Sequence, residues 1–110
     1  RHVMELGGFH KVSLEKTKEL ALMYSSQYIS QRFFALDSKG MDSIEDTLRA
    51  SNPHLMEIMP GVIGKAIQRF TTTHIPVIAG GLIETKSEVT DALGCGAAAV
   101  STGKKPLWYL

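Results

Sequence analysis

Four short, mostly apolar segments recur along the chain, roughly every 21–23 residues, and each is closed by residues that favour turns. They are Tyr28–Leu36, Leu55–Met59, Ile75–Ala79 and Ala97–Val100. Short continuous apolar runs are typical of strands that are buried on both faces of a parallel sheet. The pattern therefore predicts four strands, each followed by a turn.

Amphipathic stretches with helix-start signals separate these segments. Ser43 is the expected N-cap of one helix, and Thr85 with Glu88 has the spacing of a capping box for another. Gly94 and Gly96 supply the stop signal of that last helix. The expected helices cover residues 13–22, 43–52, 62–70 and 85–93.

Strands that alternate with helices at this spacing predict an α/β fold of parallel βα repeats with right-handed crossovers. An open, doubly wound sheet and part of a (β/α)8 barrel both fit this pattern. A complete barrel takes about 250 residues, whereas this chain has 110. The short, even units favour the C-terminal half of a TIM-type barrel, with about four βα units. Arg1–Val12 fits a further strand poorly because Gly7–Gly8 interrupts it. We expect one partial barrel domain over residues 1–110.

The composition is that of an ordinary globular domain. Charged residues make up 21% of the chain and the formal net charge is +1, which excludes a disordered tail and a general polycation. No apolar run approaches the ~20 residues that cross a bilayer, and no basic-then-apolar leader is visible. The single cysteine excludes an internal disulfide framework, so we expect a reducing, cytoplasmic location. Because Arg1 rather than methionine opens the sequence, a longer parent chain is a further expectation.

Glycines and hydroxyl residues follow the last two predicted strands. Gly80–Gly81 ends one strand, and Ser101–Thr102–Gly103 ends the next. In (β/α)8 barrels the loops after strands seven and eight commonly bind phosphate, because glycines let the backbone approach the anion. Lys104 could add charge there. The alternative is that these glycines only make tight βα turns.

Arg32 lies inside an apolar segment, where an unpaired guanidinium would be costly. Alternation puts Arg32, Phe34 and Leu36 on one face of the strand, and Glu57 is the only carboxylate of the next strand. Two interpretations stay open, a buried ion pair between Arg32 and Glu57 or a pair of side chains that contact a ligand. Asp37, which follows the strand, either caps a turn or binds a hydroxyl.

Other candidates for chemistry are weak. The four histidines lack the spacing of metal ligands, so we expect no metal site. Cys95 lies between two glycines with no histidine nearby in sequence, and we interpret it as a small buried residue rather than a nucleophile. No nucleophile elbow, Walker loop or Gly-x-Gly-x-x-Gly pattern is present. The sequence predicts no catalytic residue and no enzyme activity.

Taken together, several segments resemble one protein family in order and spacing. They are Gln31–Ser38, Met56–Gly61, Ile75–Ile83, Ala99–Thr102 and Leu107–Trp108. The chain is similar to the C-terminal half of the glycerol-3-phosphate-responsive antiterminators, the glycerol uptake operon regulatory proteins. The resemblance covers roughly residues 28–108, and the occurrence of these motifs in register makes it specific.

This resemblance implies a (β/α)8 barrel in a bacterial cytoplasm that senses glycerol 3-phosphate, binds the leader mRNA of a glycerol operon and prevents termination. It implies an effector but no cofactor. The residues it assigns to the phosphate cradle are Gly80, Gly81, Ser101 and Thr102. The residues it assigns to the pocket wall are Arg32, Asp37 and Glu57. Lys104 and Lys105 are the candidates for RNA contact.

Two other functions stay open. A phosphate-binding barrel enzyme of the isomerase or aldolase type would need an acid–base residue at a strand end, where Asp37 and Glu57 are the only candidates. An inactive barrel remnant is the other alternative. Half a barrel also leaves two sheet edges without a neighbouring strand. We therefore expect a homo-oligomer in which two copies complete one another. The alternatives are that a longer chain completes the barrel or that the sheet stays open.

Overall fold

The computed structural model describes residues 3–7 and 28–109. The helix predicted over 13–22 lies outside the described residues. The elements are β1 (Val3–Gly7), β2 (Tyr28–Phe34), α2 (Ser38–Ser51), β3 (Leu55–Met59), α3 (Gly64–Phe70), β4 (Val77–Gly80), α4 (Lys86–Gly94), β5 (Ala99–Ser101) and the 3₁₀ helix η1 (Lys105–Tyr109).

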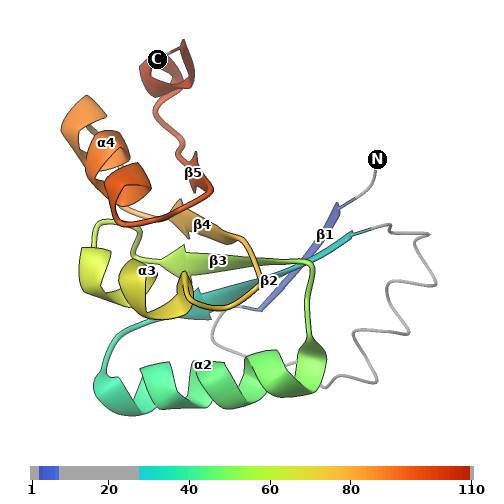
Figure 1. The fold of residues 1–110 in the computed structure, drawn as a ribbon. Helices are drawn as coiled ribbons and strands as arrows, with labels where there is room; N and C mark the ends of the chain where they lie inside the picture. Colours follow the sequence, from blue (N-terminus) through green and yellow to red (C-terminus); the bar gives the residue numbers. More distant parts are fainter. Residues whose placement is uncertain (1–2, 8–27, 110) are drawn as a thin grey trace.

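The strands form one five-stranded parallel sheet in the order β1-β2-β3-β4-β5 (Figure 1). The register sets Arg32 beside Glu57 on the neighbouring strand, and Gly80 beside Ser101. The predicted α/β fold with parallel βα repeats is therefore confirmed. Among the described strands the order never reverses, whereas a doubly wound sheet reverses at its switch point.

The first segment corrects an expectation, because Val3–Gly7 is a strand that pairs with β2 from Val3 beside Tyr28 to Gly7 beside Arg32. The prediction that Arg1–Val12 forms a poor strand was wrong. Gly7 is the last residue of the strand and does not interrupt it. Pairing with a neighbouring strand outweighs a weak local propensity, which is why the sequence pattern alone understated it.

The helix after β2 begins earlier than predicted. Asp37 is its N-cap and accepts a hydrogen bond from the Gly40 backbone N–H at 2.6 Å, so α2 starts at Ser38 and not after Ser43. The carbonyl of Ser43 instead accepts a bond from the Thr47 hydroxyl inside the helix.

The other boundaries differ from the predictions by a few residues, mostly at their ends. Leu55–Met59 matches β3, while β2 stops at Phe34, two residues before the predicted end. α3 starts at Gly64 without a side-chain cap. The capping box of Thr85 and Glu88 is confirmed at the start of α4. None of the described helices combines the length and apolar character that a membrane span requires.

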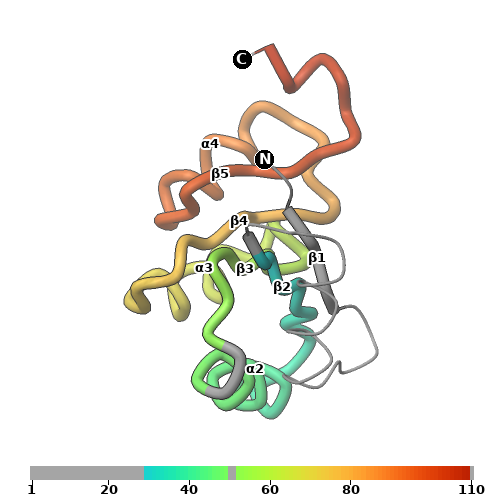
Figure 2. Tube along the Cα trace, turned by 90° about the vertical axis from the view of Figure 1, so that its right-hand side faces the viewer, coloured from blue at the N-terminus to red at the C-terminus, as the bar shows by residue number. Residues whose placement is uncertain are grey.

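The hydrophobic core lies on one face of the sheet, where α2, α3 and α4 cover it (Figure 2). Phe70 and Ile67 from α3 are fully buried against Ile58 of β3 and Val77 of β4. Alternation along the strands sends Arg32, Glu57 and Gly80 to the opposite face, which no described helix covers. The polar candidates therefore share the face that is not part of this core.

Candidate functional site

The loops after β4 and β5 lie side by side and are joined by a hydrogen bond, and a second bond holds η1 against the loop after β5. The hydroxyl of Thr102 donates to the carbonyl of Ile83 at 2.7 Å. The indole N–H of Trp108 donates to the carbonyl of Thr102 at 2.9 Å. With Gly80 and Ser101 paired across the two strands, the structure brings the four predicted cradle residues to one place.

Backbone geometry explains the glycines of this turn. Gly81 has φ +86° and Leu82 has φ +61°, so two successive residues adopt the left-handed conformation. A Cβ on Gly81 would also lie 3.0 Å from the Cε of Met59. Gly61 donates its N–H to the Gly81 carbonyl at 3.0 Å, which fixes the turn against the loop after β3.

Arg32 and Glu57 form an ion pair, which is the first of the two interpretations that the sequence left open. Arg32 Nε lies 3.4 Å from Glu57 Oε2, and the Glu57 side chain is only 7% exposed whereas that of Arg32 is 40% exposed. A Cβ on Gly80 would overlap Glu57 Oε1, so the carboxylate lies directly against the Gly80 backbone. These two pocket-wall candidates therefore adjoin the predicted cradle.

The third pocket-wall candidate has a structural task. The Asp37 carboxylate accepts the Gly40 N–H and thereby caps α2. This is the first of the two roles that the sequence left open, and a contact between Asp37 and a ligand stays a prediction.

The two candidate RNA residues begin the segment that follows β5. Lys104 and Lys105 are exposed, and the backbone N–H of Lys104 donates to the Thr102 hydroxyl at 3.1 Å. The main chain of Lys104 is thus part of the hydrogen-bonded unit that includes Thr102 and Trp108, while its side chain extends from the surface.

Sequence reasoning missed the buried hydroxyl of Ser30. Ser30 is 2% exposed, and its Oγ has no hydrogen-bond partner among the described residues. It precedes Arg32 by two positions and shares its strand face. A small hydroxyl residue within a predicted buried strand is the signal that could have identified it. The Trp108–Thr102 bond had no sequence signal, because it depends on how two loops pack.

The histidines and the cysteine of the described region have structural contacts. His54 Nδ1 accepts the Ile29 N–H at 3.0 Å, and His74 Nε2 lies 3.2 Å from Asn52 Oδ1. Cys95 is the C-cap of α4, and its Sγ lies 2.7 Å from the position that a Cβ on Gly64 would occupy. No group of His, Cys, Asp or Glu among the described residues could hold a metal ion.

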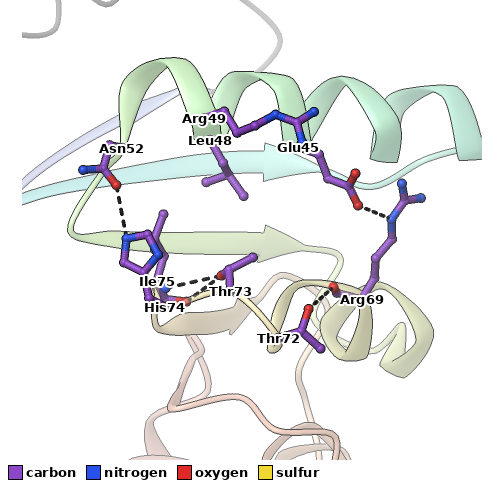
Figure 3. A pocket seen from close by; sticks show the side chains of 9 residues that line it. All are labelled: Glu45, Leu48, Arg49, Asn52, Arg69, Thr72, Thr73, His74 and Ile75. Carbon is purple, nitrogen blue, oxygen red and sulfur yellow. Dashed lines mark hydrogen bonds and ion pairs between the residues drawn. The ribbon is translucent and has the colours of Figure 1, made fainter.

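A cavity of about 550 Å³ lies at the other end of the sheet, between α2 and the segment that leads into β4 (Figure 3). Its charged side chains are already paired. Arg69 Nε donates to Glu45 at 2.9 Å and a second nitrogen of Arg69 donates to Asp42. Hydrogen bonds to Asp42 and Glu45 raise the pKa of Arg69 above its ordinary value. Arg49, which also lines the cavity, pairs with Asp46. The cavity presents no unpaired charge to a ligand.

Comparison with known proteins gives several related chains. A crystal structure of the glycerol uptake operon antiterminator regulatory protein from Listeria monocytogenes matches with a TM-score of 0.79 and 31% identity, over 98% of this chain and 55% of that chain. A glycerol uptake operon antiterminator-related protein from Thermotoga maritima matches with a TM-score of 0.71 and 29% identity, over 86% of this chain and 54% of that chain. The uncharacterized protein YgcP of Escherichia coli K12 is 34% identical over 80 residues, which is 72% of this chain and 42% of YgcP.

The chain therefore spans about half the length of these relatives. Residues 12–108 match the family described as glycerol-3-phosphate responsive antiterminator. This match covers most of the chain, including every predicted site residue. The chain belongs to the glycerol-3-phosphate responsive antiterminator family.

Proposed function

We propose that this chain is an RNA-binding antiterminator of a glycerol operon whose effector, glycerol 3-phosphate, binds at the loops after β4 and β5. The observation that carries the proposal is the Thr102–Ile83 hydrogen bond, which joins these two loops, while the Trp108–Thr102 bond holds η1 against the second loop. A phosphate needs backbone that it can approach closely and hydroxyl donors nearby, and Gly80, Gly81 and Ser101 supply both. Membership in the antiterminator family supports the identity of the effector.

The cradle residues have separate tasks in this proposal. Gly80, Gly81 and Ser101 form the surface that faces the phosphate. Because the Thr102 hydroxyl donates its proton to Ile83, Thr102 acts by holding the two loops at a fixed separation.

The glycerol moiety would lie against the Arg32–Glu57 pair and toward Asp37. A buried carboxylate beside a phosphate site is repulsive unless a cation compensates it. Arg32, at 3.4 Å from Glu57, supplies that cation. Carboxylates accept hydrogen bonds from hydroxyls, which suits a polyol.

The proposal includes no catalytic step and no cofactor. An isomerase or aldolase needs a group that can move a proton at the reacting carbon. The two carboxylates that the sequence offers as acid–base candidates have other partners, since Asp37 caps α2 and Glu57 pairs with Arg32. The regulatory family supports the same conclusion.

We also infer that the sheet is the C-terminal half of a (β/α)8 barrel and that the protein acts in the cytoplasm, where its RNA target would be. Five parallel strands in sequence order, helices on one face and a match to about half of each relative all favour a barrel half. β1 and β5 are the edge strands of the sheet that the described residues form, and their outer sides would then need a partner, such as a second copy. Light scattering should give a mass above 12.0 kDa at micromolar concentration, and a monodisperse species of that mass would contradict self-association.

Titration with glycerol 3-phosphate tests the effector site. The ligand should raise the melting temperature because it binds only the folded state, and glycerol should raise it much less. Ser101 is exposed, so Ser101→Asp should fold normally yet lower affinity at least about tenfold through charge repulsion. Ser101→Asn is the matched neutral control and should bind nearly as the parent does. Equal affinities of Ser101→Asp and Ser101→Asn for glycerol 3-phosphate would show that the phosphate binds elsewhere.

A further inference from the structure

The basic residues of the described region fall into two groups. Each of its arginines is paired: Arg32 with Glu57, Arg49 with Asp46, and Arg69 with Glu45 and Asp42. Its lysines, by contrast, are all exposed, and their side chains make no hydrogen bond or ion pair within the part of the chain that the structure describes. These lysines are Lys39, Lys65, Lys86, Lys104 and Lys105.

The lysines also share one place in the fold. Lys39 and Lys65 are the second residues of α2 and α3, Lys86 opens α4, and Lys104–Lys105 leads into η1. Each of these elements follows a strand of one parallel sheet, so their first turns lie along its carboxyl edge (Figure 1). We call Lys39, Lys65, Lys86, Lys104 and Lys105 the lysine edge.

Helix stability does not explain the lysine edge. A cation in the first turn is disfavoured by the helix dipole, which favours acidic residues there. The first turns of α2 and α3 contain no acidic residue. The acidic residues next to these turns are Asp37, Glu84 and Glu88, three carboxylates against five lysines, and Asp37 and Glu88 also accept backbone N–H groups. The edge therefore carries an excess of unpaired positive charge.

Exposed apolar side chains accompany the lysines. Trp108 is 59% exposed and Tyr109 is 85% exposed, although both are large aromatic residues. The indole N–H of Trp108 is fixed to the Thr102 carbonyl, so its ring is held at the surface. Leu36 and Leu82, in the loops after β2 and β4, are also about two-thirds exposed, at 67% and 66%.

We propose that the lysine edge, with Trp108 and Tyr109, is the surface that binds an unpaired segment of RNA. The lysine ammonium groups neutralise backbone phosphates, and the two aromatic rings stack on bases. This surface deepens the proposed function, on which it rests for the nature of the partner. It extends the RNA candidates from Lys104 and Lys105 to the whole carboxyl edge of the sheet.

The location has a regulatory consequence. Thr102 is bonded both to Ile83 in the loop after β4 and to Trp108 in η1. An effector that shifts these loops also shifts the aromatic part of the RNA surface. Such coupling is reciprocal, so RNA should tighten effector binding by the same factor.

Fluorescence anisotropy with a labelled single-stranded oligouridylate, measured across salt concentrations, tests the surface. The triple variant Lys65→Gln, Lys86→Gln, Lys105→Gln should weaken binding and lower the slope of log K against log salt by about 0.7 for each phosphate that is no longer neutralised. Tyr109→Ala should weaken binding roughly tenfold with little change in that slope, because it removes stacking and no charge. Arg49→Gln is the control, since Arg49 is exposed but lies at the other end of α2, and it should change neither quantity.

The outcomes separate this surface from the proposed function. If the parent binds RNA and the triple variant binds it as tightly as Arg49→Gln does, the lysine edge is not the RNA-binding surface. The antiterminator proposal then still stands. If the parent binds neither the oligouridylate nor a glycerol-operon leader hairpin, the RNA part of the proposed function fails and this surface fails with it. A retained thermal shift with glycerol 3-phosphate shows that each variant is folded.

Discussion

The charged side chains at the two ends of the sheet differ in whether they are paired. At the amino ends of the strands, around the 550 Å³ cavity, Arg69 is held by two carboxylates and the hydroxyls of Thr72 and Thr73 donate to backbone carbonyls. At the carboxyl ends the described lysines are unpaired, Leu82 is exposed and two successive residues have positive φ. The exposed and unpaired lysines of the carboxyl end support our proposal that this end binds ligands, whereas the paired charges of the other end stabilise the fold.

The largest expected effect contrasts the two ends directly. Phe70, at the end of α3, is fully buried, while Leu82 is 66% exposed. Phe70→Ala should lower the free energy of unfolding by about 3–5 kcal/mol, whereas Leu82→Ala should change it by no more than about 0.5 kcal/mol. Urea denaturation monitored by circular dichroism measures both. Similar losses of unfolding free energy for the two variants would show that the two ends do not differ in their contribution to stability.

Gly80 tests whether a position at the proposed ligand-binding end can also be tightly packed. Gly80→Ala would drive its Cβ into the Glu57 carboxylate, so Glu57 must leave Arg32, and we expect a loss of about 1–3 kcal/mol. In Gly80→Ala/Glu57→Ala the Cβ has room, so the two losses should not add. A double-mutant cycle by urea denaturation provides the measurement. Strict additivity would mean that Glu57 does not contact Gly80.

Asp37 tests whether a residue at the ligand-binding end also supports the fold. Asp37→Ala removes the cap of α2 and should cost about 1 kcal/mol, while Asp37→Asn should retain most of the cap. Thermal denaturation compares the two variants. If Asp37→Ala lowers affinity for glycerol 3-phosphate and Asp37→Asn does not, the loss arises through the position of α2. Equal stability of Asp37→Ala and the parent would show that the cap contributes nothing.

Glu88 gives the smallest expected effect, as a dependence on pH. Hydrogen bonds from the Glu84 backbone N–H and from Thr85 lower its pKa below the ordinary value of 4.5. A lowered folded-state pKa stabilises the protein above pH 4.5, and this contribution is lost as the pH falls through the folded-state pKa. Glu88→Gln should therefore flatten the decline of the melting temperature in acid. If the melting temperature of Glu88→Gln falls in acid as that of the parent does, the ionised Glu88 of the capping box does not contribute to stability.

Much of the fold follows from periodicity, because buried strands of a parallel sheet are continuous apolar runs and β3 matched its run at both ends. Local signals failed where tertiary contacts decide the structure. β1 became a strand by pairing with β2. The start of α2 depended on whether Asp37 caps a helix, and Asp37–Ser38–Lys39–Gly40 also fits a turn.

The candidate site divides in the same way. The Arg32–Glu57 pair could be predicted, because strand alternation and neighbouring strands put both side chains on one face. The Thr102–Ile83 bond joins residues 19 positions apart through two irregular loops, and no periodicity governs that contact. The lysine edge needed the sheet order, since its members are spread from Lys39 to Lys105 along the chain.

The most direct test of the account is a ¹H–¹⁵N spectrum titrated with glycerol 3-phosphate. The chain has one tryptophan, so the single indole resonance reports on the Trp108–Thr102 bond beside the proposed cradle. We predict that glycerol 3-phosphate shifts this resonance and the amides of Gly81 and Ser101, and that glycerol leaves them in place. Shifts confined to Asn52 and His74, at the cavity on the opposite end, would contradict the assignment of the carboxyl end as the ligand-binding end.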